Sequence, residues 1–367
     1  VEYLAQAARR GFSYRPGTLR ALDRRARRIT LGTVQDADGH DAVSAVVEYD
    51  TLVLALGSRA DDFGTPGAAE HCRFIDRRDQ AEAFNQALRE QVIRHLDQPG
   101  ERPLSIAIVG AGATGVELAA ELHHALDIVA GYGLPGLRER LRITLIEAAP
   151  RILPSLPERV SEASARVLAG LGVDVLCGDA VASVDAEGLT LKGGRRIEAG
   201  LRVWAAGIRA PAVLDNLDGL ETDRAGRLRV GEDLRSVTDP HVLALGDCAS
   251  LIPPGKQKPL PATAQVAHQQ ARHMARCLSA HLRDGAPLAP FRYRERGSLV
   301  SLGGYDAFGS LGRLGVLPGG FVAGGFARFS YAMLYRQYQW VVHGLRAPLV
   351  WLAEIASRLA RPGVRLD

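Results

Sequence analysis

The sequence predicts an α/β protein with a parallel sheet of the dinucleotide-binding type, and two observations support this prediction. The apolar run 106–109 is followed at once by Gly110, Gly112 and Gly115, and a helical pattern begins within that loop. From residue 104 to about 173, apolar strands alternate with helical segments. Such alternation produces parallel sheets with right-handed crossovers, and G-x-G-x-x-G between a strand and a helix is typical of a dinucleotide site.

The remaining elements follow from hydrophobic spacing and turn residues. Helices are expected over 1–10, 77–96, 114–129, 156–171 and 263–280. Strands are expected over 49–56, 105–109, 142–146, 173–176, 201–205, 228–234 and 241–245. A β-meander is expected over 181–197, where the pair of glycines at 193 and 194 supplies a hairpin turn.

Each glycine of the loop has a separate task. Gly110 permits the tight turn, Gly112 lets the backbone approach a pyrophosphate, and Gly115 lets helix and strand pack closely. The phosphates are expected on the free N–H groups at the helix N-terminus. Glu147 ends the next strand, where a carboxylate accepts hydrogen bonds from ribose hydroxyls and repels a 2′-phosphate, which favours NAD. It lies 37 residues after Gly110, against a usual spacing of about 20, and the neighbouring Arg151 leaves NADP open.

Composition limits the class of protein. The chain has 367 residues, enough for two or three domains. A net charge of +4 gives no reason to expect a nucleic-acid partner. The four cysteines have neither the spacing of a redox dithiol nor that of a paired-cysteine zinc site. No apolar run reaches the roughly 18 residues of a spanning helix.

Two acidic residues are candidates for the site. Glu117 lies in the first turns of the helix after the glycine loop, where an acid either stabilises the helix dipole or lies beside the reacting part of the cofactor. Asp247 follows Gly246 at the end of the buried strand 241–245. A carboxylate there is well placed for a sugar hydroxyl, although Gly-Asp is also an ordinary turn.

Five motifs occur in order along the chain: ALGS (55–58), GAGATGVE (110–117), ITLIEAAPRILP (143–154), VWAAGI (203–208) and ALGDCA (244–249). Together with PATAQVAHQQA at 261–271 they make the chain resemble the flavoprotein reductases with two dinucleotide-binding domains. Among these it is most similar to type II NADH:quinone oxidoreductases, over essentially its whole length.

The resemblance implies a role for each candidate residue. It assigns NADH to the loop 110–115, including Thr114, and to Glu147, with Gly207 on the nicotinamide side and Glu117 near the nicotinamide. It assigns FAD to Gly57, Gly246, Asp247 and Ala264. Gln265 and Gln269, joined by His268, would face the isoalloxazine and the quinone. Without the resemblance, these last three residues are one polar face of a helix.

The resemblance also implies a domain plan: an FAD domain over 1–98 and 226–325, and an NADH domain over 99–225. Before Gly57 no strand–glycine loop–helix unit is found. The FAD domain is therefore expected to lack its first βαβ unit, which grips the ADP half of FAD in such enzymes. Whether the chain holds FAD without that unit is left open.

A third segment is expected over 326–367. It contains two of the three tryptophans, and its residues 326–365 carry six arginines against one acid. A basic amphipathic helix with boundary tryptophans lies in a membrane interface; the alternative is a helix packed on the body or on a second subunit. The resemblance favours the membrane, because a quinone is reached from the bilayer.

The resemblance thus implies a peripheral enzyme on the cytoplasmic face of the inner membrane. The enzyme would pass electrons from NADH through FAD to ubiquinone or menaquinone. A homodimer is possible on the same resemblance. The alternatives are a soluble NAD(P)H:acceptor reductase of the same fold and a truncated, non-enzymatic NAD-binding paralogue.

Overall fold

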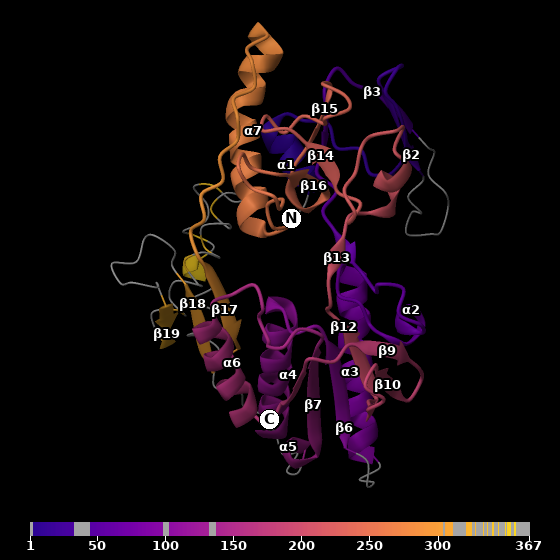
Figure 1. Cartoon of the computed structure of the whole chain (residues 1–367), viewed down its shortest axis with the longest axis vertical. Helices are drawn as coiled ribbons and strands as arrows, with labels where there is room; N and C mark the ends of the chain where they lie inside the picture. Colours follow the sequence, from indigo (N-terminus) through magenta and orange to yellow (C-terminus); the bar gives the residue numbers. More distant parts are fainter. Residues whose placement is uncertain are drawn as a thin grey trace.

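The computed structural model describes residues 3–32, 45–97, 103–131, 137–303, 305–310, 321–324 and 351–353, and several single residues between 327 and 356. The chain forms an upper and a lower lobe in the view of Figure 1. The thin ribbon that joins them pairs β5 (Arg59–Ala60) antiparallel with β13 (Ile208–Arg209).

The lower lobe contains the predicted parallel sheet. Its strand order is β12–β6–β7–β8, with bounds Leu201–Trp204, Leu104–Val109, Leu141–Glu147 and Asp174–Cys177. All three pairings are parallel, and Ile106 lies between Leu201 and Ile143. Strand β6 is almost entirely buried because helices cover both of its faces, which explains its continuous apolar run.

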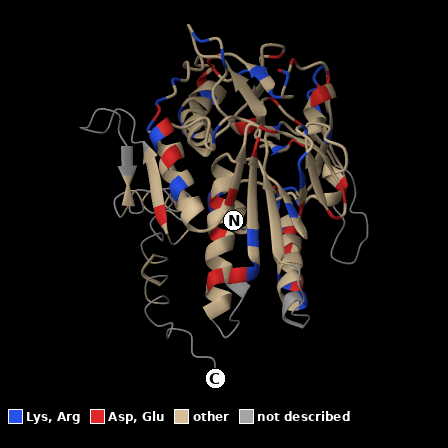
Figure 2. Cartoon of the chain, turned by 60° about the horizontal axis from the view of Figure 1, so that its bottom comes forward, with Lys and Arg blue, Asp and Glu red and all other residues tan. Residues whose placement is uncertain are grey.

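Three long helices pack around this sheet: α3 (Arg78–Asp97), α4 (Ala113–Gly131) and α6 (Glu158–Gly170). The short helices α2 (Ala68–His71), α5 (Leu137–Arg140) and η1 (Ala212–Asn216) lie in connections. Acidic and basic residues both occur along the described ribbon of this lobe (Figure 2).

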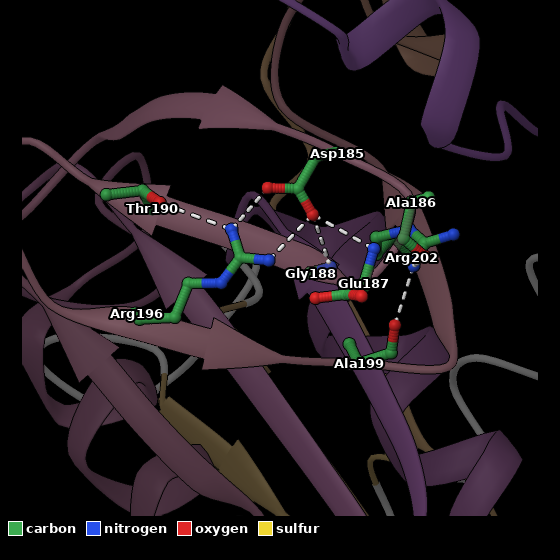
Figure 3. A network of polar contacts seen from close by, with 8 residues as sticks. All are labelled: Asp185, Ala186, Glu187, Gly188, Thr190, Arg196, Ala199 and Arg202. Carbon is green, nitrogen blue, oxygen red and sulfur yellow. Dashed lines mark hydrogen bonds and ion pairs between the residues drawn. The ribbon is translucent and has the colours of Figure 1, made fainter.

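The predicted meander forms an antiparallel sheet of β9 (Val181–Val184), β10 (Gly188–Leu191) and β11 (Arg196–Glu198). Figure 3 shows how its turns are held. The Asp185 carboxylate accepts hydrogen bonds from Arg196 at 2.5 and 2.6 Å and from the N–H groups of Glu187 and Gly188. Arg202 donates to the carbonyls of Ala186 and Ala199, each at 2.7 Å, and so ties the meander to β12.

The upper lobe begins with α1 (Tyr3–Arg10) and the antiparallel sheet β1 (Thr18–Asp23), β2 (Arg28–Gly32) and β3 (Ala45–Glu48). Two parallel pairs follow. Strand β4 (Leu52–Leu54) pairs with β15 (Val242–Ala244), and β14 (Leu228–Val230) pairs with β16 (Ala249–Leu251). The strands predicted over 49–56 and 228–234 are therefore shorter than expected.

The last two elements of the upper lobe are η2 (Gly246–Cys248) and α7 (Ala264–Asp284), which contact each other. A final antiparallel sheet, β17 (Ser298–Leu302), β18 (Asp306–Ser310) and β19 (Phe321–Ala323), lies beside α4 and α6. Its Val300, Leu302 and Phe308 belong to the same buried cluster as Val116 of α4. The sheet thus buries its apolar face against the lower lobe.

Most of the predicted segment 326–367 falls outside the described residues. Among those that are described, the Trp340 and Trp351 rings lie 5.8 Å apart, and the Arg336 guanidinium lies 5.7 Å from the Trp351 ring centroid. Leu349 and Leu352 are exposed, at 66% and 62%. Within the described ranges, no helix is both long and apolar enough to cross a bilayer.

Candidate active site

The glycine loop forms a tight connection between β6 and α4. Gly110 has φ +98°, and its N–H donates to the Ile146 carbonyl at 2.7 Å. A Cβ at Gly110 would lie 2.6 Å from the backbone of Ala206, and one at Gly115 would overlap the Gly110 carbonyl oxygen. These two glycines are therefore required by the fold itself.

Gly112 differs from its two neighbours. A Cβ built on it meets nothing within 4 Å, and its φ is not in the left-handed region. It nevertheless lines the cavity in front of the loop. The protein's own packing therefore gives no reason for a glycine here, whereas a pyrophosphate close to the backbone does. Thr114 is exposed in the first turn of the same helix.

Glu147 lies beside this loop, at the end of β7. Its carboxylate accepts the Ala111 N–H at 2.8 Å and the Ala149 N–H at 2.9 Å. Each oxygen keeps a second lone pair, so the carboxylate can still accept ribose hydroxyls. The acid thus both shapes the loop and presents negative charge to the cavity.

Arg151 is engaged by the main chain. Its guanidinium donates to the carbonyls of Leu153 at 3.0 Å, Pro154 at 3.1 Å and Leu156 at 2.8 Å. These bonds hold the side chain in the connection before α6. With its donors engaged in this way, Arg151 gives little support to the alternative in which it accommodates a 2′-phosphate. Besides Glu147, the charged residues Asp179 and Lys192 line the cavity, and the selection of NAD by Glu147 stays a prediction.

The cavity has a volume of about 620 Å³ and is bounded by segments that are far apart in sequence. One wall is the glycine loop with Glu147, another is the meander, and the third is the loop after β12 together with residues 63–66. Gly207 lies on this third wall with φ +71°, and the Phe63 ring occupies the place of a Cβ. The Trp204 ring N–H donates to the carbonyls of Asp61 and Ala206 and so holds this wall in position. The structure thus brings Gly110, Gly112, Glu147 and Gly207 to one cavity.

The predicted flavin residues gather in the upper lobe. Because β4 and β15 are parallel neighbours, the loops that follow them meet at one edge, and the Ser58 hydroxyl donates to Asp247 at 3.0 Å. Gly57 has φ +68° and open space where a Cβ would be. This open loop, with a carboxylate at its rim, fits a ligand that carries hydroxyl groups.

Helix α7 is fastened to the same edge. Its N-cap Thr263 accepts the Val266 N–H, so Ala264 begins the helix next to η2. Gln270, only 1% exposed, accepts the Gly246 N–H at 2.8 Å. Gln270 is not among the site residues predicted from the sequence, although its place four residues after Val266, on the buried face of the helix, was a usable signal.

Gln265 and Gln269 bind the chain's own backbone. Gln265 donates to the Gly297 carbonyl at 2.9 Å and accepts the Arg296 N–H at 2.8 Å. Gln269 donates to the Arg294 carbonyl at 2.8 Å and accepts the Arg294 N–H at 3.0 Å. The two amides therefore clamp segment 293–297 along α7. Their contact with isoalloxazine or quinone stays a prediction.

Glu117 links α4 to the sheet of β17, β18 and β19. Its carboxylate accepts the Ser301 N–H of β17 at 3.0 Å. Burial raises the pKa of this carboxyl, the Ser301 N–H opposes that shift, and nearby Glu121 adds to it. One turn and a half further along α4, buried His123 lies 2.8 Å from the Tyr305 hydroxyl. The helix after the glycine loop is thus bonded twice to the β17–β18 hairpin.

His268 lies half-buried on α7 between the two clamp glutamines. Burial lowers the pKa of His268, and the positive charges of Arg272 and Arg296 lower it further. In the described residues, no group of three or more His, Cys, Asp or Glu side chains is arranged to hold a metal.

A family model described as pyridine nucleotide-disulphide oxidoreductase matches residues 12–271. The type II NADH:quinone oxidoreductase of Haemophilus influenzae is 37% identical over 385 residues, covering 100% of this chain and 86% of that protein. The protein of the same description from Staphylococcus aureus is 29% identical, covering 75% of this chain and 69% of its own length. The solved structure of NDH2 from Plasmodium falciparum in complex with NADH matches with TM-score 0.79 at 18% identity, over 95% of this chain and 84% of that one.

The fold and the cavity are those of a dinucleotide-binding oxidoreductase, and the comparisons agree with the geometry. The chain belongs to the pyridine nucleotide-disulphide oxidoreductase family and, within it, to the type II NADH:quinone oxidoreductases.

Proposed function

We propose that the chain oxidises NADH and passes the electrons to a quinone, with FAD as the carrier between them. The single observation that carries the proposal is the cavity at Gly112 and Glu147, which brings a glycine loop at a helix N-terminus and a carboxylate placed for ribose hydroxyls to one site. The match to the Haemophilus influenzae enzyme over the whole chain supports the same activity.

The chain's own residues bind and orient. The α4 N-terminus and Gly112 receive the pyrophosphate of NADH, Glu147 accepts its ribose hydroxyls, and the wall at Gly207 directs the nicotinamide toward the upper lobe. The Asp247 carboxylate and the Gly57 loop would hold the hydroxyl-bearing chain of FAD, and Ala264 at the start of α7 would contact its ring system. When bound, FAD supplies the redox chemistry, accepting a hydride equivalent and delivering electrons to quinone.

Two further groups complete the proposed site. Glu117 is a half-buried carboxyl of raised pKa, so it can hold a proton near the reacting rings. Gln265 and Gln269 act as positioning residues, because their amides fix segment 293–297 against α7. A quinone would approach along this clamp.

The proposed domain plan keeps 99–225 as the NADH unit and 1–98 with 226–325 as the FAD unit. We also propose that segment 326–367 contacts the membrane surface at the cytoplasmic face. The exposed Leu349 and Leu352 and the basic, tryptophan-containing composition support this placement.

The test is a purified full-length chain assayed with NADH and with NADPH, using a short-chain quinone as acceptor and added FAD. We expect quinone-dependent NADH oxidation, a much slower reaction with NADPH, and an absorbance band near 450 nm after reconstitution. A protein that stays colourless with excess FAD and consumes no NADH would refute the proposal and favour a non-enzymatic NAD-binding paralogue.

A second candidate is a soluble reductase with a protein acceptor. The ferredoxin reductase of Rhodopseudomonas palustris has a similar fold, with TM-score 0.62 over 83% of this chain and 66% of that one. Flotation with liposomes, with and without residues 326–367, separates the two. A chain that reduces a ferredoxin and never floats would favour this second function.

A further inference from the structure

A second concave surface, here called the arginine groove, lies between α7 and segment 290–296. Its volume is about 430 Å³, and its cationic lining is Arg272, Arg276, Arg292, Arg294 and Arg296. The segment runs back alongside α7 on its way to β17 (Figure 1). All five arginines are exposed, and none of them makes an ion pair with a carboxylate in the described part of the chain.

The local geometry explains why the charges converge. Arg272 and Arg276 are four residues apart on α7 and therefore share one face of the helix. Arg292, Arg294 and Arg296 line the same groove from the segment between α7 and β17. Two arginines of one helix face and three of this segment thus meet at a single groove.

The groove is held in this shape by other residues. The Gln269 amide pairs with the main chain of Arg294, and the His273 ring lies 2.7 Å from the Ala289 carbonyl. The His273 ring also packs edge-on against Phe291, with centroids 5.6 Å apart. The arginines are therefore brought together before any ligand arrives, and none of the described ion pairs involves them.

The whole chain has an excess of only four positive charges, yet five cations without an acidic partner line this one groove. On the lower lobe, by contrast, acids and bases are interspersed (Figure 2). A concentration of arginine of this kind fits phosphate oxygens, which the planar guanidinium binds with two parallel hydrogen bonds.

We propose that the arginine groove docks the protein on a membrane by binding the phosphates of anionic phospholipid head groups. The choice of a lipid surface over free phosphate rests on the proposed function. Gln269 lines the groove and belongs to the clamp along which a quinone would approach, and a quinone dissolved in the bilayer is reached only from a surface at the membrane. The groove is a contact separate from segment 326–367.

The test is flotation of the full chain with two vesicle types, phosphatidylcholine alone and phosphatidylcholine mixed with phosphatidylglycerol. The groove variant is Arg272→Gln/Arg276→Gln/Arg292→Gln. The matched control is Arg89→Gln/Arg159→Gln/Arg166→Gln, which removes three exposed arginines from α3 and α6. Because the basic segment 326–367 would itself favour anionic vesicles, the readout is how much the groove variant loses of the wild-type preference for anionic vesicles, compared with the control.

We expect the wild type and the control to prefer the anionic vesicles. The groove variant should bind them roughly 100-fold more weakly, since each arginine at an anionic surface contributes a factor of about five. High salt should abolish the preference of the wild type, because it screens exposed charges.

A groove variant that keeps the full preference for anionic vesicles would overturn the proposal. So would a variant that loses affinity for free glycerol phosphate but not for vesicles, because the groove would then be an anion site and not a docking surface. NADH oxidation with a water-soluble acceptor, measured on the same preparations, reports on the proposed function separately. If no preparation oxidised NADH, the proposed function would be wrong, but the flotation result would still decide whether the groove binds anionic lipid.

Discussion

Gly110 and Gly112 are two residues apart in one loop, but alanine should affect them in opposite ways. Gly110 has φ +98° and no room for a Cβ, since the Ala206 backbone would lie 2.6 Å away. Gly112 has an ordinary φ and open space. We predict that Gly110→Ala damages the fold, whereas Gly112→Ala damages only the binding of NADH.

The structure sets the expected magnitudes. Left-handed backbone costs an alanine about 1–2 kcal/mol, and the overlap with Ala206 adds to this. At Gly112 a Gly→Ala change with compatible backbone is neutral or stabilises by about 0.4–1 kcal/mol. The new methyl group, however, stands in the cavity where the pyrophosphate must approach. A displacement of the bound dinucleotide by about 1 Å lowers the rate by up to about 10²-fold.

The assay pairs thermal unfolding with steady-state kinetics. Gly112→Ala should keep the wild-type Tm and lower kcat/KM for NADH at least tenfold, while KM for the quinone is unchanged. Gly110→Ala should lower Tm by several degrees. The reasoning is wrong if Gly112→Ala binds NADH normally, or if it lowers Tm as much as Gly110→Ala does.

Three further predictions concern charged residues. Glu147→Gln should weaken NADH binding about tenfold and reduce the preference for NADH over NADPH, because a neutral amide accepts hydrogen bonds from hydroxyls less strongly. An unchanged preference in kinetics with the two nucleotides competing would contradict this prediction. Burial raises the pKa of Glu117, so the folded state favours its protonated form, and stability should fall as pH rises from the ordinary glutamate value through the raised one. In the Glu117→Gln variant, Tm should no longer fall over this pH range. If Tm of the wild type and of the variant depends on pH in the same way, the prediction is wrong. Arg202→Met should lower Tm by several degrees, because three carbonyl groups lose their hydrogen-bond donor. Each carbonyl that stays buried without a partner costs about 1–3 kcal/mol of stability. Arg196→Gln, which breaks an exposed ion pair, is the control and should change Tm little.

Much of the lower lobe was predictable from local pattern. The apolar run of β6, the helix α4 and the acid that ends β7 each depend on residues that are close in sequence, and the structure confirms them. Strand ends were less predictable. The run 49–56 is mostly apolar, but only Leu52–Leu54 has a neighbouring strand with which to form ladder hydrogen bonds.

The contacts between distant segments were not predictable. Gln265 and Gln269 have the same appearance in sequence whether they face a ligand or bind the backbone of 293–297, because the partner is a main-chain group that carries no sequence signal. The same holds for Arg151. Its sequence position is compatible with binding a phosphate, and only the structure shows that its guanidinium donates to the carbonyls of Leu153, Pro154 and Leu156. Five arginines spread over 272–296 do not form a pattern until an extended segment folds back on a helix.

By itself, therefore, the sequence determined the dinucleotide loop, its preceding strand and the acid that ends β7, since glycine conformation and strand burial act over a few residues. Only the tertiary structure decided which glycine the fold requires and which one faces the ligand. It also decided that Glu117 bonds to β17 and that the arginines converge. Each of these depends on a neighbour more than 15 residues away, whose position is set by packing of the whole chain.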